Sequence, residues 1–430
     1  MKLNYILVLI LLPFLLATSC KREEDRIFDT NATVRMTEAV KQAYSVFQTN
    51  KAGWVMKFYP SKNQEFGGYT VFTKFISNDQ VSIASDPIAG IETSSYTISP
   101  ESGPVLTFNG YNKSIHWFSE PGKDNGGIGA DDSGMRGDFE FIILKATADS
   151  VVLKGKKSGT HLVMLPLKDG EFENMSKAFQ EAASAFKQFG VFNLETKNGE
   201  SARMQYNPKI RVFNNPLDQT AKPMPFRVVP GGLEFYESFT LDGGTFSRLD
   251  YVAASSNYPY GYYTDKSGTF KIVPDITPIN LWFKSNLWSM SYSNVGPTGK
   301  VFWDNARTKL KANGIILNNM YIGNAGIEVI YYVLQNGAVE GAVGHDIVLV
   351  PGTVDQVRIN FTSSLYNVSG FSAAYWTGGL SEFTTPLNGR TFKITADVLN
   401  EPSSVLLTDI AIPTNTFRVF LKDINDPLNN

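Results

Sequence analysis

The sequence predicts an α+β protein, mainly β, built from modules that each combine one helix with an antiparallel sheet. Two amphipathic stretches have apolar residues at helical spacing, and each precedes a long series of short apolar runs with a period near two. Turn residues separate these runs. No helical stripe lies between the runs of the first series, and in the second series one weaker helix is expected over residues 301–312. Strands in this arrangement favour antiparallel meanders.

Length, charge and composition limit the classes of protein that this sequence can encode. The chain has 430 residues, which is enough for two or three hydrophobic cores. Its 39 Lys and Arg nearly balance 41 Asp and Glu. A nucleic-acid partner is therefore not expected, because binding phosphates requires a basic face. With 43% hydrophobic residues, the chain is globular rather than disordered.

The N-terminus contains Cys20, the only cysteine of the chain. A basic start, an apolar run over residues 6–16 and the small residues Ala17, Thr18 and Ser19 precede it, as in a secretory signal. The apolar run is shorter than the roughly 20 residues that span a bilayer. A cysteine at this position resembles the lipobox of bacterial lipoproteins, in which the thiol is acylated. An ordinary signal-peptide residue and an uncleaved anchor are the alternatives.

Residues 21–31 follow as an expected surface tether that carries Glu23, Glu24 and Asp25. This acidic run resembles the export signal that sends Bacteroidetes lipoproteins to the outer leaflet of the outer membrane. The alternative is a solvated linker, which is what short charge runs often are. We expect a protein that is lipid-anchored in the outer membrane and faces the cell exterior.

The first folded domain is expected over residues 32–168. Apolar residues from Met36 to Phe47 form one helical stripe, and Gly53 marks its end. Short strand-like runs then continue from Trp54 to Leu165, among them one at residues 115–118. The pattern predicts a helix packed on an antiparallel meander.

A second helix-plus-β domain is expected over residues 169–430. A helical stripe from Phe172 to Phe189 opens it. Two local similarities favour an internal duplication, with chance as the alternative: residues 98–108 resemble 229–235, and residues 139–153 resemble 392–407. A duplication would leave a large insertion in the second copy at about residues 240–385. Insertions of this kind often carry function.

Motifs for catalysis are absent from the sequence. It has no Gly-x-Ser-x-Gly elbow, no His-Glu-x-x-His pair and no phosphate-binding loop. His116, His161 and His345 are too scattered to predict a zinc site, with His345 expected in a turn, and acylation would consume the Cys20 thiol. No catalytic residue, metal or cofactor is expected, although a pair of carboxylates has no short signature and stays open.

A Gly- and Asp-rich loop at residues 124–132 has oxygen ligands of the kind that calcium prefers. Its spacing does not match the twelve-residue calcium-binding loop, and no glutamate closes it. A surface loop is therefore expected, because Gly and Asp are also the common residues of turns.

Aromatic residues concentrate between residues 251 and 303. The candidates for a ligand-binding platform are Tyr258, Tyr260, Tyr262, Tyr263 and Trp288. Exposed rings with few charges form flat surfaces that bind sugars or protein partners. The alternative is that these rings fill the core, as most aromatic side chains do.

Three features together resemble an uncharacterised family of Bacteroidetes surface lipoproteins. They are the Cys20 anchor with its acidic follow-on, the strands at residues 139–144 and 151–155, and the turn and strand at residues 232–236. The resemblance implies an accessory of SusC/SusD-like nutrient-uptake systems. It implies no functional residue.

The leading hypothesis is a non-enzymatic lipoprotein that binds a glycan or a peptide for uptake across the outer membrane. A carboxylate-based hydrolase of the same polymers is the first alternative. A structural subunit that docks on the transporter without a ligand of its own is the second.

Overall fold

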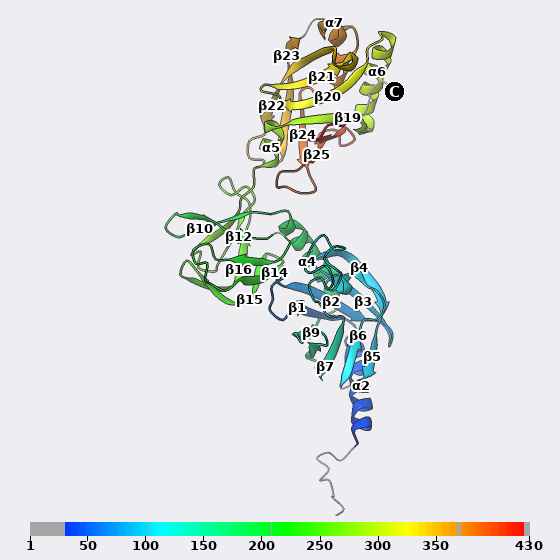
Figure 1. Cartoon of the computed structure of the whole chain (residues 1–430), viewed down its shortest axis with the longest axis vertical. Helices are drawn as coiled ribbons and strands as arrows, with labels where there is room; N and C mark the ends of the chain where they lie inside the picture. The colour runs from blue at the N-terminus through cyan, green and yellow to red at the C-terminus, as the bar shows by residue number, and fades with distance from the viewer. Residues whose placement is uncertain (1–30, 102, 208, 368–370, 425–430) are drawn as a thin grey trace, which may run out of the picture.

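The computed structural model describes residues 31–101, 103–207, 209–367 and 371–424, and it is mostly β. Three units follow one another along the long axis of the molecule, with the C-terminal unit at one end and the helix α2 (Ala32–Thr49) at the other (Figure 1). Cys20 and most of the expected tether lie outside the described residues.

The first unit is a nine-stranded antiparallel sheet with the strand order β4-β3-β2-β1-β9-β8-β7-β6-β5. Its elements, besides α2 and the short helix α3 (Lys113–His116), are β1 (Trp54–Phe58), β2 (Tyr69–Phe75), β3 (Gln80–Ser85), β4 (Ile88–Ser95), β5 (Thr97–Pro100), β6 (Pro104–Thr107), β7 (Glu140–Ala146), β8 (Val151–Gly155) and β9 (His161–Pro166).

Helix α2 begins where Asn31 caps it, because the Asn31 side chain accepts a 2.9 Å hydrogen bond from the Val34 amide. Its apolar stripe faces the sheet. Phe47 is fully buried and stacks on Phe75 of β2 at 4.3 Å between ring centroids. The stripe that the sequence shows is thus the face that joins the core of the first unit.

One local expectation in this unit is wrong, and one strand was not expected. Residues 115–118 were expected to form a strand, yet α3 forms there because the Asn112 side chain accepts a hydrogen bond from the Ser114 amide. Strand β4 was not predicted from the sequence. It is an edge strand whose residues are mostly exposed, so apolar and polar residues do not alternate clearly along it.

The second unit begins with helix α4 (Glu171–Lys187) and continues as another nine-stranded antiparallel sheet, with the order β11-β10-β18-β17-β16-β15-β14-β13-β12. Its strands are β10 (Phe192–Glu195), β11 (Ser201–Arg203), β12 (Gln205–Tyr206), β13 (Val212–Asn214), β14 (Met224–Val229), β15 (Gly232–Leu241), β16 (Gly244–Val252), β17 (Tyr262–Thr264) and β18 (Lys271–Pro274).

The two sheets share a topological feature. In each, the first strand of the unit pairs with the last, β1 with β9 and β10 with β18, and the remaining strands follow in sequence order. The sheets differ in which two consecutive strands do not pair with each other and form the sheet edges. These are β4 and β5 in the first sheet and β11 and β12 in the second.

The third unit is a closed antiparallel barrel of β19 to β26. Its elements are α5 (Ile279–Ser285), β19 (Leu287–Val295), α6 (Pro297–Ala312), β20 (Leu317–Asn324), β21 (Glu328–Leu334), η1 (Gln335–Gly337), β22 (Val339–Leu349), β23 (Gln356–Asn367), α7 (Phe371–Trp376), η2 (Leu380–Phe383), β24 (Arg390–Thr395), β25 (Ser404–Asp409) and β26 (Thr416–Phe420).

The barrel changes how the C-terminal half is divided. Strands β24 to β26 were expected to complete the second domain after an insertion, yet they belong to the barrel. There β24 pairs with β23, β26 pairs with β19, and β25 lies between β24 and β26. Strand β18 already completes the second sheet by pairing with β10. Local strand patterns do not specify which distant strand is the partner, so the sequence did not reveal this division.

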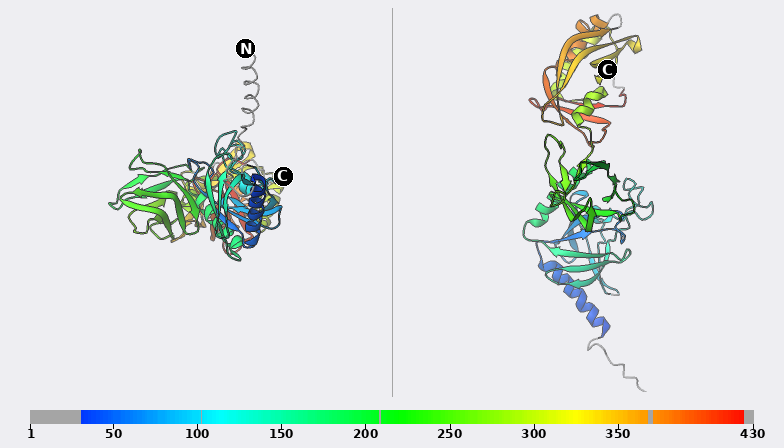
Figure 2. Two further views of the ribbon diagram at one scale, coloured as in Figure 1. Left: turned by 90° about the horizontal axis from the view of Figure 1, so that it is seen from below. Right: turned by 90° about the vertical axis from the view of Figure 1, so that its left-hand side faces the viewer.

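No helix in the described ranges is both long and apolar enough to cross a membrane. The side view in the right panel of Figure 2 shows the second sheet lying against the first unit, with the barrel at the far end.

Candidate functional site between the first and second units

The first and second units meet along helix α4, which packs on β2, β3 and β4 of the first sheet and on β14 of the second. A small apolar cluster fills this junction. Phe179 of α4 lies edge-on to Phe72 of β2, with ring centroids 5.4 Å apart, and Val229 of β14 belongs to the same buried cluster. The helical stripe that begins the second unit thus also joins it to the first.

Backbone hydrogen bonds cross the same junction. The Gly68 amide donates to the Phe226 carbonyl at 2.9 Å, and the Arg211 amide donates to the Phe66 carbonyl at 3.4 Å. Gly67 has φ +72°, and a Cβ there would collide with the Arg211 carbonyl oxygen. Only glycine allows the two backbones to approach this closely.

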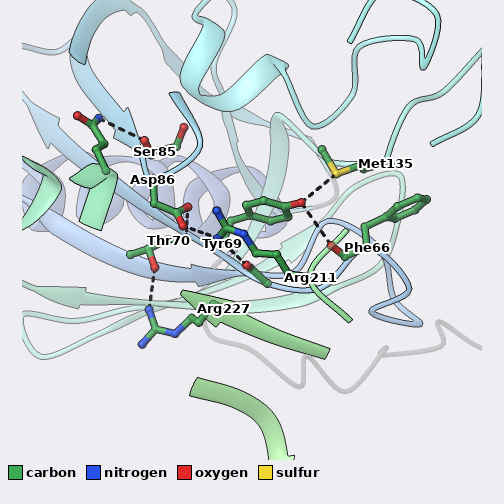
Figure 3. Close-up of polar contacts among 10 residues, drawn as sticks. Phe66, Tyr69, Thr70, Ser85, Asp86, Met135, Arg211 and Arg227 are labelled. Carbon is green, nitrogen blue, oxygen red and sulfur yellow. Dashed lines mark hydrogen bonds and ion pairs between the residues drawn. The ribbon is translucent and has the colours of Figure 1, made fainter. Parts of the chain in front are cut away.

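A buried ion pair lies at the centre of the junction (Figure 3). Asp86, which follows β3, pairs with the Arg211 guanidinium, and its Oδ1 accepts a 2.9 Å hydrogen bond from the Thr70 amide. Burial raises the pKa of Asp86, and the Arg211 charge opposes that rise. Arg211 Nη1 also donates to the Gly68 carbonyl at 3.1 Å, so both charged groups have partners in the junction.

Arg227 forms a second polar link between the units. Its Nη1 donates to Thr70 Oγ1 at 2.8 Å, and its Nη2 donates to Glu234 at 2.6 Å. Glu234 also pairs with Lys57 of β1. These contacts hold β14 and β15 against the first sheet.

Beside the ion pair, a pocket of 240 Å³ opens between the two units. Four aromatic residues line it: Tyr69, Trp117, Phe186 and Tyr206. The Arg211 guanidinium lies 4.3 Å from the Tyr69 ring centroid, and the Tyr69 hydroxyl donates to the Phe66 carbonyl at 3.3 Å. Burial raises the pKa of Tyr69 to about 12, so this phenol is neutral at physiological pH.

The lining of the pocket is cationic. Lys187, at the end of α4, and Lys209 both line it with exposed side chains. Neither lysine forms an ion pair with a residue in the described part of the chain. The charges of Arg211 and Asp86 cancel, so the two lysines give the lining a net charge of +2.

Gln180 of α4 lies at the rim of the pocket next to the edge strand β4. Its side-chain nitrogen donates to the Gly90 carbonyl at 2.8 Å, and its side-chain oxygen accepts from the Gly90 amide at 3.2 Å. One amide side chain therefore occupies both hydrogen-bonding groups of an edge residue.

The tyrosines that the sequence singled out lie elsewhere, in the second unit. Tyr258 and Tyr262 are half-buried, and the Lys271 ammonium lies 4.5 Å and 5.3 Å from their ring centroids. The Tyr258 hydroxyl donates to Glu195 at 2.7 Å and accepts from Lys271 at 2.6 Å. The two rings therefore belong to a surface cluster with Lys271 and Glu195.

The other candidates of that set are not a platform. Tyr260 is half-buried and packs against the core of the second unit, Tyr263 is buried within that core, and Trp288 is fully buried in the barrel. The Trp288 indole N–H donates to the Phe283 carbonyl at 2.9 Å. Burial against neighbouring apolar side chains removes Tyr263 and Trp288 from the surface, which corrects the expectation that they bind a ligand.

Within the described ranges, no three His, Cys, Asp or Glu side chains come together as a metal site. His345 lies on β22 rather than in a turn, and its ring is buried. The loop at residues 124–132 lies beside the pocket, since Ile128 is one of its lining residues.

Sequence reasoning did not identify the pocket. Its lining comes from three separate regions, residues 69–128, helix α4 and residues 206–211. Tyr69, Tyr206 and Arg211 carry no motif and no unusual spacing. The single available signal was the helical stripe of α4, which shows which face of the helix is buried and not what lies beside it.

The fold and the site define a modular, mostly β protein that has a cavity at the joint of its first two units. The chain belongs to the family described as Domain of unknown function (DUF4302), whose match covers residues 24–253. That match includes both sides of the pocket and ends after β16, so β17, β18 and the barrel lie outside it.

Other comparisons add little. No curated protein matches the chain. A solved structure titled "Crystal structure of HCR/D-Sa-GBL1/C" aligns over 77% of this chain and 78% of that chain at 10% identity, with a TM-score of 0.09.

Proposed function

We propose that the protein is a non-enzymatic binding lipoprotein of the cell surface. In this proposal Cys20 carries the lipid anchor in the outer membrane, and the folded units face the exterior. The protein captures a nutrient glycan or peptide and serves as an accessory of a SusC/SusD-like uptake system. The pocket between the first two units is the observation that carries the proposal.

The pocket has the composition of a small-molecule site. Such sites are concave and mostly apolar, with a few polar groups that orient the ligand. Here Tyr69, Trp117, Phe186 and Tyr206 supply the apolar surface, and Lys187 and Lys209 supply cations with no partner among the described residues. Its 240 Å³ lies somewhat below the ~300–1,000 Å³ of sites for drug-sized ligands, which suits one ring or one side chain of a polymer.

The shape of the molecule also favours this function. Helix α2, which follows the tether, lies at the end opposite the barrel (Figure 1). The residues that line the pocket belong to the first two units and not to the barrel. The tether of residues 21–31 would reach ~40 Å if extended at ~3.3–3.6 Å per residue. Such a tether would hold the pocket well clear of the lipid headgroups.

The pocket does not favour the hydrolase alternative. Glycosidases of the common mechanisms use two carboxylates that flank the bond to be broken. Among the described residues that line the pocket, Asp86 is the single carboxylate, and it is buried against Arg211.

We further propose that the first two units arose by duplication. Each has a helix followed by nine strands in which the first strand pairs with the last. This shared strand order supports the proposal, with the barrel as a separate addition rather than an insertion.

Binding measurements on the mature chain test the proposed function. Titration calorimetry with a panel of oligosaccharides and oligopeptides should detect at least one ligand. The Tyr206→Ala variant should weaken its Kd about tenfold, because a lost ring contact of ~1.4 kcal/mol corresponds to a factor of ten.

The control for this experiment is Tyr258→Ala, which removes a half-buried ring of the second unit that does not line the pocket. It should leave the Kd unchanged. If no member of the panel binds, the proposal fails, and co-purification with the transporter in the absence of any ligand would then favour a structural subunit.

A further inference from the structure

We infer that the pocket between the first and second units recognises an acidic sugar, a saccharide that bears a carboxylate or sulfate group. This inference rests on the proposed binding function and specifies its ligand class. Three observations carry it: the aromatic lining, the two lysines and the blocked edge of β4.

The aromatic lining suits the flat faces of a sugar ring. A pyranose presents C–H groups on its faces and hydroxyls around its rim, so it packs on an aromatic side chain while its rim stays hydrated. Trp117 and Tyr206 are only partly buried, and they come from different units. A ring bound between the units would contact side chains of both.

The lysines favour an anion. Lys187 and Lys209 line the pocket without an ion-pair partner among the described residues, whereas the Arg211 charge is already matched by Asp86. A carboxylate or sulfate on the ligand would form charge-assisted hydrogen bonds with these ammonium groups. The net charge of +2 in the lining would also attract an acidic ligand during its approach.

The β4 edge disfavours an extended peptide. A peptide that binds as an added strand needs free amide and carbonyl groups on a sheet edge. Next to the pocket, Gln180 already bonds both the amide and the carbonyl of Gly90 on the edge strand β4. A sugar does not need those groups, so the same contact leaves its binding unaffected.

Three matched probes test the inference by titration calorimetry of the mature chain: tri-galacturonate, its methyl ester and an acidic tripeptide. Tri-galacturonate should bind at least tenfold tighter than the ester at low salt. The double variant Lys187→Glu/Lys209→Glu should abolish that preference, and 0.5 M NaCl should reduce it because salt screens exposed charges.

Two further variants serve as controls. Lys177→Glu changes an exposed lysine on the same helix and should leave all three affinities unchanged. Lys187→Gln/Lys209→Gln removes the charges without placing a carboxylate at the C-terminal end of α4, where the helix dipole disfavours it. This variant should lose the preference for the acid while keeping the wild-type unfolding midpoint.

The outcomes separate the inference from the proposed function. If tri-galacturonate and its ester bind equally, the lysine variants have no effect and Tyr206→Ala weakens both, the binding function holds and the acidic-sugar inference is overturned. Tighter binding of the acidic tripeptide than of tri-galacturonate also overturns it. If neither these probes nor any of the wider panel binds, both proposals fail together.

Discussion

Replacing Asp86 by alanine is expected to destabilise the junction of the first two units by about 3–5 kcal/mol. Arg211 would stay buried, with its side chain only 11% exposed, and would lose the carboxylate that balances its charge. The Thr70 amide would lose its acceptor in the same change. Hydrogen exchange of peptides from β2, β3 and β14, measured by mass spectrometry, reports the loss at both sides of the junction.

The control is an exposed ion pair. Lys177→Ala removes the contact of Lys177 with Glu181 on the surface of α4, and it should change stability by no more than about 0.5 kcal/mol. The double variant Asp86→Leu/Arg211→Met should recover much of the loss, because it leaves no buried charge without a partner. Equal effects of Asp86→Ala and Lys177→Ala would contradict the assigned role of the buried pair.

Acidification is expected to destabilise the barrel by about 3 kcal/mol between pH 6.5 and pH 4. The His345 ring on β22 is buried, and its Nδ1 lies 3.1 Å from the Val343 carbonyl. Its Nε2 has no hydrogen-bond partner among the residues that the structure describes. Burial lowers the pKa of His345 from 6.5 to about 4, with the Asp346 charge partly opposing this shift.

The sign follows from the two protonation states. Below pH 6.5 the unfolded chain binds a proton at His345 and the folded barrel does not, so the free energy of unfolding falls as the pH falls. Below pH 4 the folded barrel also binds the proton, and this contribution becomes constant. About 2 kcal/mol of the loss should be present at pH 5.

Urea unfolding at several pH values measures this effect through the fluorescence of the barrel tryptophans Trp288 and Trp303, both fully buried. His345→Leu should remove the dependence in this pH range. His161→Gln, at an exposed position on β9, should preserve it. If the free energy of unfolding of the wild-type barrel stays constant from pH 6.5 to pH 4, protonation of His345 does not destabilise the folded state, and the prediction is wrong.

Helices and many strands of this protein were predictable from local patterns. The stripe from Met36 to Phe47 forms α2, and the stripe that begins at Phe172 forms α4, because apolar residues at helical spacing share one face. Patterns of this kind failed at residues 115–118, where the cap at Asn112 starts a helix instead of a strand.

Local patterns did not predict which segments distant in the sequence pair or pack together. The strand at residues 392–394 was expected to complete the second domain, yet it pairs with β23 and β25 in the barrel. The rings of Tyr258, Tyr262 and Trp288 drew attention because they cluster in sequence. Tertiary contacts decide instead that Trp288 fills the core and that the two tyrosines surround Lys271.

The sequence by itself determined the elements: the two helices that begin the first two units, most of the strands that follow and the absence of common catalytic motifs. These properties depend on residues close together in the chain, where periodicity and capping act. Only the tertiary structure decided the junction, because Asp86 and Arg211 are 125 residues apart and neither lies in a recognisable motif. The candidate pocket exists because folding packs three separate segments around one space.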